Sequence, residues 1–172
     1  MKLFNNTKIT YADKTDSDLA RAYLLFKIIS KPYFAKFLTK FLEFAIRIKL
    51  PIQRIVKLTI YKQFCGGTSI KESELTINKL WESGIGTILN YSVEGKKDLE
   101  EFNRTKCEII STIKKASYSK NIPFAVFKPT AISSFSLLEK ITNKSVLNKK
   151  ELKEKIETEA RIEVICKNAV DL

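Results

Sequence analysis

The chain of 172 residues contains no histidine and only three cysteines, five glycines and four prolines. Without histidine, Ser-His and Cys-His nucleophilic catalysis is excluded, and so is the commonest metal ligand in proteins. The spacing of Cys65, Cys107 and Cys166 matches no metal-binding or redox motif, so we interpret them as ordinary thiols in a reducing compartment. Any proton transfer must therefore involve Lys, Tyr or carboxylate side chains, or a bound cofactor.

Long uncharged hydrophobic runs are also absent. The most apolar window, Tyr33 to Leu50, contains five charged residues, which argues against a transmembrane helix. The first eighteen residues have no apolar core and include three aspartates, which argues against a signal peptide and against a mitochondrial transit peptide. The predicted location is the cytoplasm, with peripheral attachment to a bacterial inner membrane as an alternative.

The net charge of +12 is concentrated at the start of the chain. Residues 1–62 carry 13 basic and 4 acidic side chains (+9), whereas residues 63–172 carry 18 and 15 (+3). The segment "KPYFAKFLTKFLEFAIRIKLP" combines an apolar face with a lysine-rich polar face. This pattern is typical of a helix packed on its own domain, but also of an interfacial helix. One alternative function is therefore a small basic helical module that binds an anionic membrane surface or nucleic acid.

Local patterns predict mostly helix. Residues 15–64 are predicted to be helical without strands, with breaks at Pro32 and Pro51. After Gly66 and Gly67, a capping box of Ser69 with Glu72 starts a helix over 69–83. Two strands are predicted over 86–92 and 122–128, with helices over 97–117, 134–141 and 149–170. In the last helix, apolar residues recur every four positions: Leu152, Ile156, Ala160 and Val164.

The alternation of strands and helices after residue 65 predicts the α/β class with parallel pairing. Both strands are continuous apolar runs, as in sheets that are covered on both faces. Two parallel strands leave both sheet edges unpaired, so they do not complete a domain. We therefore expect this chain to be a truncated piece of a larger α/β domain.

Polar residues follow both predicted strands. The first strand becomes polar at Asn90, Ser92 and Glu94, and the second ends at Lys128. Sites in α/β folds lie at the carboxyl ends of the strands. Side-chain alternation places Asn90 and Lys128 on one face, side by side at that end. The alternative is a strand-end amide and a lysine that extends to solvent.

Two segments carry a resemblance to a known family. "KQFCGGTSIKESELTINKLWESGIGTILNYSVEG" and "IPFAVFKPTAI" resemble the N-terminal part of proline dehydrogenases, in the branch found in Bacteroidetes-type bacteria and mitochondria. The most specific feature is a Leu-Asp/Asn-Tyr-Ser-Val-Glu strand paired with a Phe-Lys-Pro-Thr strand. The resemblance implies a helical arm over residues 1–65. It also implies that residues 66–172 form the first βα units of a (β/α)8 barrel, incomplete in this chain.

The resemblance also implies an activity. Proline dehydrogenases hold FAD non-covalently, oxidise L-proline to 1-pyrroline-5-carboxylate by hydride transfer to FAD, and pass electrons to a quinone. Lys128 matches a lysine that binds the proline carboxylate, and Asn90 stands where the family has an aspartate that supports the cationic cluster. The implied partners are proline, a quinone and, through the basic N-terminal helices, a membrane, but not nucleic acid. The chain ends before other site residues of the family, so we expect it to be inactive alone.

Overall fold

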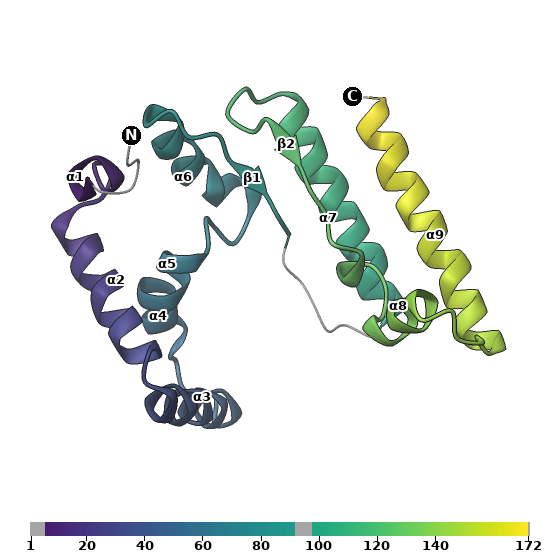
Figure 1. Ribbon diagram of the computed structural model, residues 1–172, viewed down its shortest axis with the longest axis horizontal. Coiled ribbons are helices and arrows are strands. Elements are labelled where there is room, and N and C mark those ends of the chain that lie inside the picture. Colours follow the sequence, from purple (N-terminus) through teal and green to yellow (C-terminus); the bar gives the residue numbers. More distant parts are fainter. Residues whose placement is uncertain (1–5, 92–97, 172) are drawn as a thin grey trace. The chain divides into compact units, whose positions relative to one another are not determined.

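The computed structural model describes residues 6–91 and 98–171 (Figure 1). The chain divides into two compact units, Met1–Lys79 and Leu80–Leu172. This division after Lys79 rests on compactness, whereas the predicted boundary after residue 65 rests on a change in the sequence pattern. The two do not test one another, and the boundary after residue 65 stays a prediction.

The first unit is built from helices. They are α1 (Thr7–Thr10), α2 (Asp16–Ile29), α3 (Pro32–Arg47), α4 (Gln53–Val56), a π-helical turn (Lys57–Tyr61), α5 (Lys62–Phe64) and most of α6 (Ile70–Glu82). The hydroxyl of Thr15 caps α2 by accepting a hydrogen bond from the Asp18 amide at 3.2 Å. Pro32 occupies the first turn of α3, where its missing N–H costs nothing. The prediction of helices without strands over residues 15–64 is confirmed.

The carboxylate of Asp18 links the start of α2 to α5. It accepts hydrogen bonds from Thr15 Oγ1 at 2.9 Å and Arg21 Nη2 at 2.8 Å, and it lies 3.4 Å from Lys62 Nζ. The Thr15 hydroxyl and then the Arg21 guanidinium hold the pKa of Asp18 well below its ordinary value. This one carboxylate therefore joins two helices that are more than forty residues apart in sequence.

Glu72 forms only half of the predicted capping box. The Glu72 amide donates to Ser69 Oγ at 3.2 Å, as predicted. The Glu72 carboxylate, however, accepts from the amide and hydroxyl of Thr68, at 3.0 and 2.6 Å, and not from the Ser69 amide. It also pairs with Lys57 Nζ at 3.1 Å. The Thr68 hydrogen bonds, followed by Lys57, lower the pKa of Glu72 to about 2.

This shift gives the first unit a specific acid sensitivity. The ordinary carboxyl value is 4.5, so the contribution of Glu72 to stability is fully present above pH 4.5. It is lost as the pH falls toward about 2, because the unfolded state takes up a proton on Glu72 at a higher pH than the folded state does. We expect Glu72→Gln to flatten this part of the pH profile in hydrogen exchange of α6. Thr68→Val, which removes the hydroxyl donor, should flatten it partly. An unchanged profile in both variants would contradict the assignment.

Gly67 allows the chain to pass close to the start of α6. A Cβ atom at Gly67 would lie 2.6 Å from the Ser73 backbone nitrogen, whereas one at Gly66 would lie 3.9 Å from Ser73 Oγ. We expect Gly67→Ala to destabilise the first unit by about 2 kcal/mol, because backbone must shift to admit the methyl group. Gly66→Ala is the matched control and should be close to neutral. Hydrogen-exchange protection of α6 measures both, and equal effects would argue against the contact.

In its described residues, the second unit contains the end of α6, three further helices and a small sheet. After α6 the chain continues through β1 (Ile88–Leu89), α7 (Leu99–Ser117), β2 (Phe124–Ala125), a 3-10 turn (Pro129–Ala131), α8 (Phe135–Thr142) and α9 (Lys149–Val170). Gly84 follows α6 with a positive φ of 74°, a conformation that favours glycine at the end of a helix. Asn148 and Glu151 form a complete capping box at the start of α9.

The sheet is shorter than predicted but has the predicted direction. β1 and β2 pair in parallel, with Ile88 opposite Phe124 and Leu89 opposite Ala125. Each strand has two residues where seven were predicted, because neither strand has a second neighbour in the described sheet to extend the ladder. The described chain is thus mostly helical with one parallel strand pair, which is consistent with part of an α/β enzyme.

The core of the second unit lies between α7 and α9, which run side by side (Figure 1). Its buried residues are Ile109, Ile113, Ile132 and Ile165, with Phe127 packed against them. The period-four pattern correctly predicted α9, but Leu152, Ile156 and Val164 are exposed. The buried positions of α9 are Thr158, Arg161 and Ile165. No helix in the described parts of the chain is both long enough and apolar enough to span a bilayer.

Candidate functional site

The side chains of β1, β2 and the two residues that follow β2 differ in how far they are buried. Phe127 packs on the core between α7 and α9, and Leu89 is half-buried. Ile88, Phe124 and Val126 are exposed, although all three are large and apolar. The face that alternation assigns to Asn90 and Lys128 therefore carries large exposed apolar side chains, although Ala125 on the other face is exposed as well.

Asn90 and Lys128 follow the two strands at the same end of the sheet. Counted on from the observed register, Asn90 is level with Val126, and Lys128 lies two residues further along the second strand. Both side chains are exposed. Both residues thus lie beyond the carboxyl ends of the paired strands, and an offset of two residues between them follows only if the same register is continued. Ser92 and Glu94, the other polar residues of the first strand's end, lie outside the described residues.

Side chains of α9 fix the segment that follows Lys128. Arg161 Nη1 donates to the carbonyl oxygen of Ile132 at 2.8 Å, and Thr158 Oγ1 donates to Ser133 Oγ at 3.1 Å. The amide of Ser134 donates to Glu154 Oε1 at 3.2 Å. The three residues on α9 are spaced four and three apart, so they form one stripe of the helix. This stripe holds residues 132–134, which lie four to six residues beyond Lys128.

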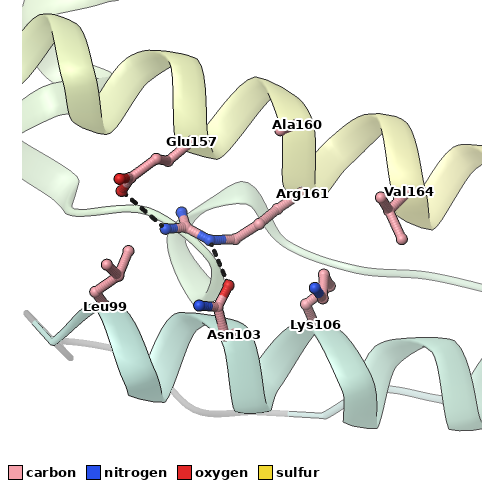
Figure 2. A pocket seen from close by; sticks show the side chains of 7 residues that line it. All are labelled: Leu99, Asn103, Lys106, Glu157, Ala160, Arg161 and Val164. Atoms are coloured by element: carbon pink, nitrogen blue, oxygen red, sulfur yellow. Dashed lines mark hydrogen bonds and ion pairs between the residues drawn. The ribbon is translucent and has the colours of Figure 1, made fainter.

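Arg161 is the central residue of that stripe. Only 4% of it is exposed, and its guanidinium lies 5.3 Å from the centre of the Phe102 ring. Figure 2 shows it reaching from α9 toward α7, where Nε donates to Asn103 Oδ1 at 3.2 Å. Nη2 makes no hydrogen bond within the described residues and lies 3.6 Å from Glu157 Oε2. Burial lowers the pKa of Arg161, and the carboxylates of Glu157 and Glu154 oppose this effect.

A cavity of about 300 Å³ lies beside Arg161 (Figure 2). Its lining comes from α7 and α9: Leu99, Asn103, Lys106, Glu157, Ala160, Arg161 and Val164. The cavity is separate from the carboxyl ends of the strands, because none of its lining residues belongs to β1, β2 or the segments that directly follow them. Arg161 already interacts with Asn103 and Glu157 of this lining, so we interpret the cavity as a gap beside the arginine and not as the substrate site.

Sequence reasoning did not identify Arg161. The signal in the sequence is weak: Arg161 shares a helical stripe with Thr158 and Ile165, so a basic residue interrupts what could be a buried face. Its main partner, the Ile132 carbonyl, is 29 residues away. A contact over this distance cannot be inferred from local spacing.

Comparisons with known proteins find relatives for most of the chain. "Proline dehydrogenase 1, mitochondrial" of Dictyostelium discoideum is 32% identical over 143 residues, which cover 81% of this chain and 25% of that protein. The protein of the same name from Bos taurus is 28% identical over 111 residues, 63% of this chain and 19% of that protein. "Carbapenem antibiotics biosynthesis protein CarD" of Pectobacterium carotovorum subsp. carotovorum is 27% identical over 85 residues, 49% of this chain and 23% of that protein.

No family model and no solved structure matches the chain. The chain spans a quarter or less of the length of the three relatives. Two of the three carry the name proline dehydrogenase, and the match to the Dictyostelium protein includes about four fifths of the present sequence. The resemblance seen in the sequence is thereby confirmed: this chain is related to the proline dehydrogenases, and it corresponds to part of such an enzyme.

Proposed function

We propose that the chain is the N-terminal portion of an FAD-dependent proline dehydrogenase, which converts L-proline to 1-pyrroline-5-carboxylate and passes electrons to a quinone. The observation that carries the proposal is the 32% identity to the Dictyostelium enzyme over 143 residues. The absence of histidine is compatible with this chemistry, because the flavin supplies the redox step and the protein supplies orientation and charge. On this proposal the chain alone is inactive, and residues 66–172 are the first βα units of a (β/α)8 barrel.

The proposed substrate groups are Lys128 and Asn90. A primary ammonium is a strong partner for the proline carboxylate once bound substrate has displaced water from the pair. An amide can donate and accept hydrogen bonds, but it cannot offset the positive charge of a neighbouring lysine. Lys128 would therefore bind the carboxylate, and Asn90 would orient the groups around it. The shared face and the shared end of the sheet support this assignment.

The face of the sheet that alternation assigns to Asn90 and Lys128 has a composition that fits a flavin. Bound FAD accepts the hydride that leaves the proline ring. Its flat ring system needs an apolar surface with polar groups at one edge. Ile88, Phe124 and Val126 are exposed apolar side chains on one face, and Asn90 and Lys128 follow at its carboxyl end. These apolar residues are the ones in this chain that would contact the ring.

The proposed location is the cytoplasm, with peripheral attachment to a bacterial inner membrane, where a quinone is available, as the alternative. The two proline dehydrogenases that match the chain are named as mitochondrial proteins. The alternative function, a basic helical module, is favoured by the basic excess of residues 1–62 and by the exposed phenylalanines of α3. That surface is compatible with the enzyme assignment.

The proposal is tested with two polypeptides, the chain itself and the longest polypeptide that its gene encodes. We expect the longer one to be yellow with bound FAD and to reduce a quinone analogue when L-proline is added, but not when L-leucine is added. The shorter one should not turn over proline. A longer polypeptide that neither holds flavin nor oxidises proline would refute the assignment. Proline oxidation by the 172-residue chain alone would support the activity but refute the proposal that this chain is only an inactive part of the enzyme.

Restoring an acid at position 90 should increase activity. In the polypeptide that oxidises proline, we expect Asn90→Asp to raise kcat/KM several-fold, because a carboxylate compensates the cationic substrate site and an amide does not. Asn90→Ala is the comparison that removes the amide without adding charge, and it should lower kcat/KM. Equal or lower activity of Asn90→Asp would show that the site does not need this charge.

A further inference from the structure

Helix α3 and the residue after it carry an apolar stripe that the described residues of the first unit leave exposed. Four phenylalanines and an isoleucine recur at intervals of three, four, three and four, which puts them on one side of the helix. Their exposed fractions lie between 48% and 65%: Phe34, Phe37, Phe41, Phe44 and Ile48. We call these five residues the phenylalanine stripe. Exposed apolar residues are common singly, but an aromatic line along a whole helix indicates a binding surface.

A different side of α3 packs within the unit. Ala45 is fully buried, and Ala35, Leu38 and Leu42 are half-buried. These four residues lie about a quarter-turn of the helix away from the phenylalanine stripe at 100° per residue. Packing of α3 on its unit therefore uses the small and aliphatic side chains and leaves the phenylalanines outside. Sequence periodicity alone would have assigned both sets to one buried face.

Basic residues border the stripe on its other side. Lys36, Lys40 and Arg47 lie about a quarter-turn from the phenylalanines, opposite to the packed side. From residue 27 to residue 54 the sequence has seven basic side chains and one acidic side chain, Glu43, a net charge of +6. The exposed surface of α3 thus combines apolar rings with a strip of positive charge.

We propose that the phenylalanine stripe docks α3 onto the surface of a lipid bilayer that contains anionic headgroups. In this arrangement the helix lies in the plane of the membrane, with the rings at the boundary of the acyl chains and the basic side chains at the phosphates. No described helix is suited to crossing the bilayer, which is compatible with a helix that lies on it. The inference does not depend on proline oxidation, because it uses only the surface of the first unit.

Charge argues against two other occupants. If a second copy covered the stripe, two segments of net charge +6 would be brought together, and the repulsion would oppose the contact. The phosphates of a nucleic acid would pair with the lysines of α3. Binding of a phosphate backbone is mainly electrostatic, however, and does not require a continuous apolar line along the helix. An anionic bilayer satisfies both the rings and the positive charges.

The test is flotation of the 172-residue chain with vesicles. We expect binding to phosphatidylcholine vesicles that contain about a third phosphatidylglycerol, and much weaker binding to phosphatidylcholine alone. Phe37→Ser with Phe41→Ser should weaken binding at least about 100-fold, about tenfold for each ring withdrawn from the boundary. The matched control is Tyr118→Ser with Val146→Ser, which removes two exposed apolar side chains from the second unit and should leave binding unchanged.

Two further measurements separate the apolar and the electrostatic contributions. Lys36→Gln with Lys40→Gln should weaken binding at low salt and matter less at high salt. The control for charge is Lys149→Gln with Lys150→Gln on α9, which should leave vesicle binding nearly unchanged. A Phe37→Trp, Trp81→Phe variant should shift its fluorescence to shorter wavelength with anionic vesicles. Circular dichroism checks that each variant folds, and because the replaced side chains are exposed, we expect unchanged spectra.

Several results would overturn the proposal. They are no binding of the chain to anionic vesicles, equal binding to both vesicle types, and full binding by the double serine variant. Self-association in sedimentation that is lost in the serine variant, without vesicle binding, would assign the stripe to a second copy. Tighter binding to single-stranded DNA than to vesicles would assign it to nucleic acid.

Discussion

Replacing Arg161 with methionine is expected to destabilise the second unit by about 3 kcal/mol, because it leaves buried partners without a hydrogen bond. Arg161 is 4% exposed and donates to the Ile132 carbonyl at 2.8 Å and to Asn103 Oδ1 at 3.2 Å. Ile132 itself is fully buried, so water cannot replace the lost donor. Methionine has a similar length but no donor, and Glu157 would also lose its ion pair.

Hydrogen exchange measured by mass spectrometry is the appropriate assay, since a chain with two compact units is not required to unfold in one step. We expect protection to fall in α9 and in residues 131–134. Protection in α2 and α3 should not change. Arg161→Lys keeps the charge but loses the planar fork of donors, so it should be intermediate.

Lys153→Met is the matched control for this prediction. It removes a positive charge from the same helix, but the Lys153 side chain is largely exposed and its ion pair with Glu157 is long, at 3.9 Å. Exposed pairs of this kind contribute little, so the change should be below about 0.5 kcal/mol. Equal effects of Arg161→Met and Lys153→Met would show that the charge matters and the buried hydrogen bonds do not.

The helices could be predicted from the sequence because their determinants are local. Thr15 caps α2, Pro32 starts α3, Gly84 ends α6, and Asn148 with Glu151 starts α9. Each of these signals acts within about one helical turn, so no knowledge of distant partners is needed. The predicted ranges of the helices consequently agree with the structure to within a few residues.

The buried face of α9 could not be predicted in the same way. The apolar residues that recur every four positions are exposed, and the buried stripe contains Thr158 and Arg161. Hydrogen bonds to residues 132 and 133 compensate the cost of burying these two polar residues. These partners precede them in the sequence by more than twenty positions. Strand length has the same dependence on distant neighbours, which explains why both strands were predicted too long.

The predicted placement of Asn90 and Lys128 side by side stays a prediction, because both residues lie beyond the observed strand pairing. Alternation alone puts Asn90 and Lys128 on one face, and the parallel pairing agrees with the chain order of the elements. The offset of two residues between them depends on which residues pair across the sheet, and the sequence contains no local signal for this. The roles of both residues in binding proline stay predictions.

Lys128→Met should raise the KM for L-proline about 100-fold in the polypeptide that oxidises proline, with a much smaller change in kcat. Removing one partner of a desolvated charge pair costs about 2–5 kcal/mol, and 100-fold corresponds to the lower part of this range. The effect falls on KM because the carboxylate is equally charged before and after hydride transfer, so Lys128 binds substrate and transition state alike.

Two variants show whether the position or only the charge is responsible. Lys120→Met removes an exposed lysine at the amino end of the same strand segment and should leave KM within about twofold, because charge at that distance is screened. Lys128→Arg keeps the charge on a larger, planar group and should recover part of the affinity. If Lys128→Met lowered kcat with KM unchanged, the lysine would act in the chemical step. If it changed neither constant, Lys128 would be the solvent-exposed lysine that the strand end alone predicts.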